Sequence, residues 1–254
     1  MRVRILGCGT SSGVPRVGND WGSCDPSEPK NRRRRVSILV EQDDSRILVD
    51  TGPDLREQLL DADVADVDAV IWTHDHADHC HGIDDLRQLF HARGAAVTGF
   101  ARPEVIETLL TRFGYAFRGN DGYPPVATVD PIDRDFQVGG VRVRAVDQPH
   151  GNIRSLGLRF DGPGGSIGYS TDVNRLTDDM VALFEGVDLW IVDALRRRPH
   201  PSHASLAEAL AWIALVQPRR AILTHMDHSM DYNSLRAELP AGVEPGYDGQ
   251  EVLL

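Results

Sequence analysis

The segment Asp68-Ala69-Val70-Ile71-Trp72-Thr73-His74-Asp75-His76-Ala77-Asp78-His79 decides how this chain is interpreted. Its first half is an apolar run typical of a buried strand, and its second half holds four metal-binding side chains within six residues. Alternate residues of an extended segment point the same way, so His74 and His76 can converge on one ion. Asp78 and His79 then turn toward a neighbouring point. Imidazole and carboxylate ligands suit zinc, manganese or iron in a hydrolytic site.

The composition is that of a globular protein with one domain. The chain has 254 residues, of which 41% are hydrophobic and 26% charged, so it can bury a core without disulfides. No linker or repeat divides it, and we expect a single domain over residues 1–254. Its three cysteines are unpatterned, the N-terminus lacks a signal-peptide pattern, and no run of ~18 apolar residues could span a bilayer. We therefore expect a cytoplasmic protein with no membrane partner.

The formal net charge of −11 limits the choice of partners. Affinity for a nucleic acid depends on Lys and Arg neutralising phosphates, so this balance disfavours a nucleic acid as the main partner. Two bound divalent cations would offset four of the negative charges. Two-fold dimers are the commonest oligomers, and a homodimer is the assembly we would expect first.

Strand and helix patterns alternate along the chain, which predicts an α/β or layered α+β architecture. Functional candidates recur at or just past the ends of apolar runs, where layered folds place their loops and ligands, and they are His74, Asp172, Asp193 and His225. The expected strands are 1–7, 36–40, 47–49, 68–73, 140–146, 155–160, 166–170, 188–192, 220–224 and a short one near Val252, and the expected helices are 54–60, 83–91, 104–113 and 205–216.

The motif Thr73-His74-Asp75-His76-Ala77-Asp78-His79 resembles the signature of the metallo-β-lactamase superfamily. The resemblance implies a four-layer αββα sandwich of the α+β class and two divalent metal ions, manganese or zinc with iron as a further candidate. It also implies three later ligands, and His150, Asp172 and His225 stand in the right order. One ion would be held by His74, His76, His150 and Asp172, and the other by Asp78, His79, His225 and the same Asp172.

Further segments resemble the phosphoribosyl 1,2-cyclic phosphate phosphodiesterase branch of this superfamily. They are Gly7–Pro15, Lys30–Ser37 and Asp193–His203. His203 stands two residues before the capping-box pattern Ser205-Leu206-Ala207-Glu208, so we expect it at a helix N-terminus, where a phosphate is favoured. The resemblance implies that His203 is a general acid, although a histidine bonded to local backbone is the alternative. We count Asp78 with His203 as catalytic as well as with the ligands.

Asp50, in Leu48-Val49-Asp50-Thr51-Gly52, resembles the family's early aspartate that supports a ligand histidine. A turn-forming Asp-Thr-Gly explains the same residues nearly as well. In the N-terminal loop, known relatives of this branch carry a cysteine cluster that holds a structural zinc with a later histidine. Here only Cys24 remains, with His228 at the place of the later histidine. Two ligands cannot close such a site, so we expect no third zinc and a loop stabilised by Trp21 or local hydrogen bonds.

Three minor features are open to two interpretations. The stretch Arg118–Pro125 is non-periodic and could act as a lid. Tyr115, Phe117 and Tyr123 flank it and could stack on a base or ribose, and core packing explains Tyr115 and Phe117 about as well. The run Arg32–Arg35 could bind phosphate, but a solvated, salt-bridged face is the interpretation that we prefer.

The leading functional hypothesis is a dinuclear-metal-dependent phosphodiesterase that uses a metal-bridging hydroxide on a small cyclic ribose phosphate or nucleotide-like substrate. Alternatives with the same ligand set are a tRNA 3′-processing endonuclease, a thioesterase of the glyoxalase II type, and a non-catalytic binding or carrier protein. The acidic balance weakens the endonuclease, and the complete ligand set weakens the carrier. Because each histidine must be neutral to bind metal, activity should fall in acid.

Overall fold

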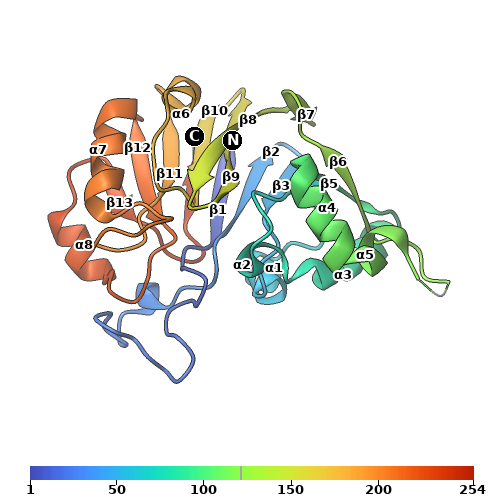
Figure 1. Cartoon of the computed structure of the whole chain (residues 1–254), viewed down its shortest axis with the longest axis horizontal. Helices are drawn as coiled ribbons and strands as arrows, with labels where there is room; N and C mark the ends of the chain where they lie inside the picture. Colours follow the sequence, from blue (N-terminus) through green and yellow to red (C-terminus); the bar gives the residue numbers. More distant parts are fainter. Residues whose placement is uncertain (121) are drawn as a thin grey trace.

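The computed structural model describes residues 1–120 and 122–254 and places two mixed sheets face to face between two layers of helices (Figure 1). The first sheet has the order β14 (Glu251–Leu253), β1 (Arg2–Gly7), β2 (Ser37–Gln42), β3 (Ser45–Val49), β4 (Ala69–Ile71), β5 (Val97–Ala101), β6 (Ala127–Pro131). The second has the order β13 (Val243–Pro245), β12 (Arg220–Thr224), β11 (Leu189–Asp193), β10 (Gly165–Ser170), β9 (Ile153–Gly162), β8 (Val141–His150), β7 (Phe136–Val138).

The helices lie on the outer faces of the sheets. The first sheet is covered by α1 (Leu55–Ala62), α2 (Ala77–Cys80), α3 (Leu86–Arg93), α4 (Pro103–Arg112) and α5 (Gly114–Arg118), with a short 3₁₀ turn at Ile83–Asp85. The second sheet is covered by α6 (Asp178–Phe184), α7 (Leu206–Val216) and α8 (Tyr232–Glu238). A second 3₁₀ turn, Pro29–Asn31, lies in the N-terminal loop and bonds to the start of α8. The four-layer αββα sandwich expected from the sequence is confirmed.

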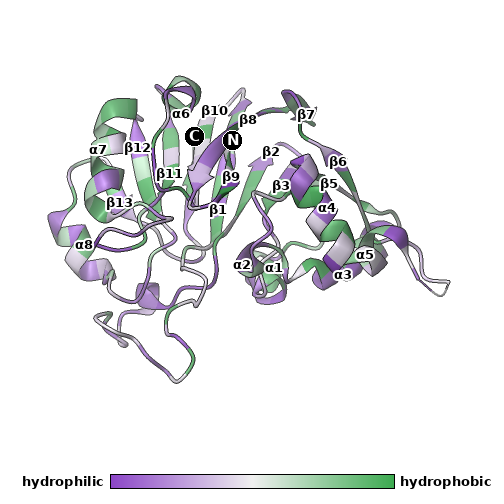
Figure 2. Cartoon of the chain, in the orientation of Figure 1, coloured by the Kyte–Doolittle hydropathy of each residue, from purple (hydrophilic) through white to green (hydrophobic). Residues whose placement is uncertain are grey.

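Alternation along the strands builds two cores. Ile38 and Val40 of β2 are buried between the sheets, whereas Leu39 between them is buried under the helices of the first sheet. In β4, Ala69 and Ile71 are likewise buried between the sheets, and Val70 is buried under the helices of the first sheet. Figure 2 shows hydrophobic and hydrophilic residues mixed along both the strands and the helices, with α7 among the most hydrophobic helices. Burial on both faces fixes the register, because a shift by one residue would exchange the two sets.

The parallel parts of both sheets end beside one another, and this edge carries the candidate ligands. Strands β3 to β6 are parallel in the first sheet, and strands β10 to β13 are parallel in the second. Asp50 follows β3, His74 follows β4, Asp172 follows β10 and His225 follows β12. The fold therefore brings residues from distant parts of the sequence to one edge, as layered folds commonly do.

Most expected elements are present, with shifted ends. Strand β8 extends to His150 rather than ending at Val146, and the helix expected over 83–91 begins as a 3₁₀ turn and ends at Arg93. Strands β5, β6, β7 and β13 were not expected, nor were helices α2, α5, α6 and α8. Within the described residues, no helix combines the length and apolar character needed to cross a membrane.

The candidate lid lies away from the predicted ligands. Asp121, within Arg118–Pro125, is outside the described residues, and Asn120, Tyr123 and Pro124 of the same stretch line a cavity of about 340 Å³. Tyr115 and Tyr123 line this cavity, and none of the seven predicted ligands does. Phe117 packs edge-on against Trp72 at 5.8 Å between ring centroids, which supports its core interpretation. The lid stays a prediction.

The arginine run does not form a uniformly solvated face. Arg34 and Arg35 pair with acidic side chains as expected, but Arg33 is only 2% exposed, and for this residue the expectation was wrong. Its guanidinium donates to the carbonyls of Asp227 and Met230 at 3.3 and 2.6 Å. A buried arginine thus ties the N-terminal loop to the segment after His225.

The N-terminal loop is held by local contacts and by Arg33. The Trp21 indole donates to Asn19 at 3.1 Å, and Arg32 lies over its ring. Cys24 Sγ lies 3.8 Å from the Arg33 guanidinium, whereas the nearest acidic partner of His228 is Asp20 at 3.7 Å. The described residues group neither Cys24 nor His228 with other candidate ligands. The absence of a third zinc stays a prediction.

Candidate metal centre

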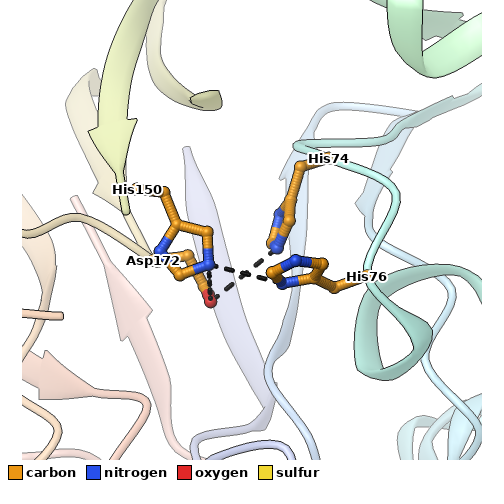
Figure 3. Close-up of side chains that lie close together, drawn as sticks. All are labelled: His74, His76, His150 and Asp172. Atoms are coloured by element: carbon orange, nitrogen blue, oxygen red, sulfur yellow. Dashed lines mark hydrogen bonds and ion pairs between the residues drawn. The ribbon is translucent and has the colours of Figure 1, made fainter. Parts of the chain in front are cut away.

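The first group of candidate ligands comprises His74, His76, His150 and Asp172 (Figure 3). Nε2 of His74 and Nε2 of His150 lie 3.8 and 3.5 Å from Oδ1 of Asp172. Nε2 of His150 also lies 3.3 Å from Nδ1 of His76. The four side chains come from both sheets and converge on one point.

The second group uses the other oxygen of Asp172. Nε2 of His79 lies 3.1 Å from Oδ2 of Asp172 and 3.4 Å from Oδ2 of Asp78. Nε2 of His225 lies 3.5 and 3.7 Å from the same two oxygens. Asp172 therefore presents one carboxylate oxygen to each group, and it is 1% exposed.

Backbone conformation helps to aim three of these side chains. Asp50, Asp172 and His225 have φ of 64°, 55° and 58°, in the left-handed region. Non-glycine residues adopt this region infrequently, and Asp and His are among those found there more often. Each residue directly follows a strand or lies just beyond its end. The turn away from the strand direction points these side chains into the space between the sheets, and such strained positions concentrate at functional sites.

Asp50 supports the second group from behind. Nδ1 of His79 donates to Oδ2 of Asp50 at 2.7 Å, and the Thr73 hydroxyl donates to the same oxygen at 2.9 Å. Asp50 is fully buried. Gly52, two residues after Asp50, packs closely on the carbonyl of Asp78. A side chain at position 52 would place its Cβ 2.4 Å from that oxygen. The supporting role expected for Asp50 is therefore seen in its contacts, and the glycine that follows serves close backbone packing.

Two further histidines, His74 and His150, are also oriented through Nδ1. Nδ1 of His74 lies 3.1 Å from the Thr73 hydroxyl, which can accept its proton because it donates its own to Asp50. Nδ1 of His150 donates to the carbonyl of Ser202 at 2.7 Å. A proton held on Nδ1 leaves a lone pair on Nε2, which is the arrangement that supports metal binding.

The unpartnered atoms of the site fit a pair of cations. Nε2 of His74, Nε2 of His79 and both ring nitrogens of His225 are buried and make no hydrogen bond to any residue that the structure describes. Buried polar atoms rarely remain unpartnered without a functional reason. The lone pair on Nε2 of His150 faces Nδ1 of His76, an arrangement that a cation between them would stabilise. The clusters are consistent with a dinuclear metal site.

The pKa shifts within the second group also fit a site for a cation. Burial would lower the pKa of His225, but the carboxylates of Asp172 and Asp78 raise it to about 9. The pKa of His79 is raised well above its ordinary value, also against burial, by Asp172, Asp78 and Asp50. Burial would raise the pKa of Asp172, yet His225 and His79 hold it well below its ordinary value. In the second group, the protonated rings of His79 and His225 thus provide positive charge that a cation would otherwise supply.

The first group differs in charge. Burial and then the neighbouring His79 lower the pKa of His74 well below its ordinary value. Burial also lowers the pKa of His150, although Asp172 opposes the shift. These two imidazoles are therefore neutral at pH 7 and ready to bind a cation.

His203 lies at the edge of both groups. Its Nδ1 donates to the fully buried Asp193 at 2.9 Å and lies 3.8 Å from Oδ1 of Asp172. Geometry alone also allows His203 to join Asp172 and His225 as a ligand. The nitrogen nearest Asp172 is the one bonded to Asp193, so that bond would have to break before this nitrogen could bind a cation. Ser205 and Glu208 form both bonds of the expected capping box at the start of α7.

All seven predicted ligands lie together, and three supporting residues were not assigned roles from the sequence. They are Thr73, Asp193 and the Ser202 carbonyl. Asp193 was a functional candidate at the end of an apolar run and lies in a segment that resembles the phosphodiesterase branch, but its bond to His203 was not predicted. A backbone carbonyl has no sequence signal, and Thr73 could have been noticed only as the residue before the first histidine.

The comparisons with known proteins agree with this architecture. Residues 45–226 match the family described as "Beta-lactamase superfamily domain". The chain is similar to the crystal structure of a new diphosphatase from the PhnP family, with 33% identity, a TM-score of 0.91, and coverage of 100% of this chain and 98% of that chain. It shares the fold of Zn²⁺-bound PqqB from Methylobacterium extorquens, with 19% identity, a TM-score of 0.79 and full coverage of both chains.

One curated relative is longer than this chain. It is named octanoyltransferase, comes from Porphyromonas gingivalis (strain ATCC BAA-308 / W83), and is 34% identical over 262 residues. The match covers 100% of this chain and 52% of the relative, so the chain spans about half the length of that protein.

The bond between Asp50 and His79 yields a prediction about metal affinity. Asp50→Asn removes the negative charge behind His79, and we expect affinity at the second group to fall about 10- to 100-fold, as for other carboxylates that support a ligand histidine. Competition with a chromophoric chelator measures the change. The exposed Asp133→Asn is the matched control and should bind as the unmodified protein does. Equal affinities of all three proteins would show that Asp50 has only a structural role.

The unequal pKa shifts predict a two-step release of metal in acid. A cation must displace protons from His79 and His225, whose pKa values are raised, but not from His74 and His150, whose pKa values are lowered. Affinity at the second group should therefore fall as the pH drops below the pKa of His225, about 9, by up to about tenfold per unit of pH for that proton. Metal content after dialysis between pH 8 and 5 should drop from two ions to one before it reaches zero. Simultaneous loss of both ions would contradict this account.

Proposed function

The chain belongs to the metallo-β-lactamase superfamily, and from that premise we propose that it is a metal-dependent hydrolase of small phosphodiesters, such as a cyclic ribose phosphate or a nucleotide-like molecule. One observation carries the proposal. A single buried carboxylate, Asp172, faces two groups of histidines, and a separately oriented histidine, His203, lies beside it.

The ligand set accounts for the hydrolytic part of the proposal. When bound, two divalent cations would supply Lewis acidity and lower the pKa of water toward neutrality. The protein contributes position and charge. Asp172 and Asp78 provide negative charge in a buried setting. Asp50, Thr73 and Ser202 bond to Nδ1 of His79, His74 and His150, which leaves Nε2 of these three rings for a cation. The metal-ligand role of the seven residues is part of this proposal.

His203 supplies the proton that a phosphodiester leaving group needs. Its Nδ1 proton stays on the side of Asp193, so a second proton on Nε2 can pass to the departing oxygen as the phosphorus–oxygen bond breaks. The ring is then neutral, and the buried carboxylate of Asp193 still fixes its orientation. This arrangement favours an alkoxide leaving group, which departs poorly without a proton.

The similar proteins support the choice of a phosphorus centre. A diphosphatase that is 33% identical over the full chain acts at phosphorus, as its name states. The zinc reported for PqqB supports zinc as one candidate metal for the same fold, with manganese and iron as the others. The net charge of −11 weighs against a tRNA substrate, although human tRNase Z shares the fold at 17% identity.

A second candidate function is hydrolysis of an acyl thioester. It is favoured by the name of the relative from Porphyromonas gingivalis, which refers to transfer of an octanoyl group. Thioesterases of the glyoxalase II type share the ligand set. The orientation of His203 by Asp193 favours the phosphodiester, because a thiolate leaves more readily than an alkoxide and gains less from an acid.

The test compares three substrates with the metal-loaded protein. They are bis-p-nitrophenyl phosphate, a ribose 2′,3′-cyclic phosphate and an octanoyl thioester. We expect turnover of the first two, and His203→Ala should lower kcat/KM for the cyclic phosphate about 10²- to 10⁴-fold, the usual contribution of a general acid. The loss should be smaller for bis-p-nitrophenyl phosphate, because p-nitrophenolate leaves without a proton.

The exposed His91→Ala is the matched control for this experiment. It should leave both rates unchanged. Turnover of the thioester alone would replace the phosphodiesterase proposal with the second candidate. Equal losses with both phosphodiesters in His203→Ala would contradict its role as the acid.

A further inference from the structure

The backbone between the first two candidate ligands is held by an arginine from a helix. Asp75 separates His74 from His76, and its carbonyl accepts a hydrogen bond from Nη1 of Arg112 at 2.6 Å. Nη2 of Arg112 lies 3.5 Å from the carboxylate of Asp75, and a partly exposed ion pair of this length adds little. The main contact therefore joins a charged donor to a backbone carbonyl, a stronger bond than one between two neutral groups.

His76 depends on this backbone more than the other histidines of the first group do. It is the only exposed residue among the seven predicted ligands. Nδ1 of His74 and Nδ1 of His150 are bonded to the Thr73 hydroxyl and the Ser202 carbonyl. Among the described residues, the ring of His76 makes no hydrogen bond apart from its 3.3 Å contact with His150. Because no bond from behind fixes this ring, the backbone at positions 75 and 76 sets its place.

The thiol of Cys80 supports the same turn from inside the protein. Its Sγ donates to the carbonyls of Asp75 and His76 at 3.4 and 3.1 Å, and the side chain is fully buried. A thiol is a weak donor. Arg112 therefore supplies the stronger of the two bonds to the Asp75 carbonyl.

Packing of α4 holds Arg112, its last residue, in a defined place. Val105 and Leu109 of this helix are buried in the outer core of the first sheet. Phe113, directly after the helix, packs edge-on against His81 with 5.6 Å between ring centroids. His81 ends α2, which begins directly after His76. The end of α4 is thus in contact with the ligand segment on two sides.

The start of α4 is fixed to the second sheet. Arg102 precedes the helix, and its Nε donates to Asp147 at 2.8 Å while its Nη1 donates to the carbonyl of Ile132. Asp147 belongs to β8, the strand that ends at His150. The two ends of α4 therefore contact the two segments that carry His76 and His150, whose rings approach each other in Figure 3.

From these contacts we propose that Arg112 is a positioning residue for the first group of ligands. By holding the Asp75 carbonyl, it keeps His76 within reach of the ion that the other three ligands bind. Arg112 acts through His76 and is not itself a ligand. The inference rests on the metal-ligand role that the proposed function gives to the first group, but it does not depend on which ester is hydrolysed.

Zinc binding in a protein with an incomplete second group isolates this effect. His225→Ala removes a ligand of the second group and none of the first. Competition with a chromophoric chelator then gives the Kd for Zn²⁺ at the first group. In this background we expect Arg112→Ala to raise the Kd about tenfold, within the range for groups that support a metal ligand. Arg112→Lys keeps a charged donor and should restore part of the affinity.

A double-mutant cycle shows whether Arg112 acts through His76. In the same background, His76→Ala removes the ligand that Arg112 is proposed to position. Arg112→Ala should then change the Kd by less than about twofold, whereas a general effect on folding would persist. Arg87→Ala is the matched control, because Arg87 is also 44% exposed and pairs with an aspartate, Asp84, at 3.0 Å. It should leave the Kd unchanged.

The outcomes separate this proposal from the proposed function. An unchanged Kd in Arg112→Ala, or a loss of equal size with and without His76, would overturn the positioning role alone. Failure of the unmodified protein to bind Zn²⁺ would refute the metal centre, and this proposal with it. Zinc affinity that depends on Arg112 through His76 would support the proposal even if no phosphodiester is hydrolysed.

Discussion

The carboxylate of Asp172 is the group on which the site depends. An isolated carboxylate in a buried position costs several kcal/mol of desolvation, so it is retained only where positive charge compensates it. Here His79 and His225 provide that charge in the absence of metal and keep the pKa of Asp172 well below its ordinary value. Because its two oxygens face different groups of histidines, Asp172 is placed so that both groups could share it.

The architecture follows from the need to surround this carboxylate. No single strand could provide all of its neighbours, because successive residues of a strand point to opposite faces. The ends of the parallel strands of both sheets lie beside one another, so that both sheets can contribute neighbours. His74 comes from one sheet and His225 from the other, and both lie near Asp172. The supporting bonds of Asp50 and Ser202 then fix ring orientation, which a loop alone would leave free.

The sequence predicted what is encoded locally and missed what depends on distant partners. The first four ligands are close in sequence, and the capping box before α7 needs only Ser205 and Glu208, so both were accessible. Burial of Arg33 was not, because its partners are carbonyls almost two hundred residues away. Strand β5 was missed because Gly99 interrupts its apolar pattern, and the structure gives the reason for that glycine, since Trp72 packs directly against it.

The measurement that tests the central claim most directly is metal content per chain by plasma mass spectrometry, for the unmodified protein and for Asp172→Ala. The account predicts about two divalent ions in the unmodified protein. It predicts fewer than one in the variant, with the fold retained by circular dichroism, because both groups lose a shared ligand. A metal-free protein after loading, or a variant that keeps both ions, would contradict the claim that Asp172 joins two metal sites.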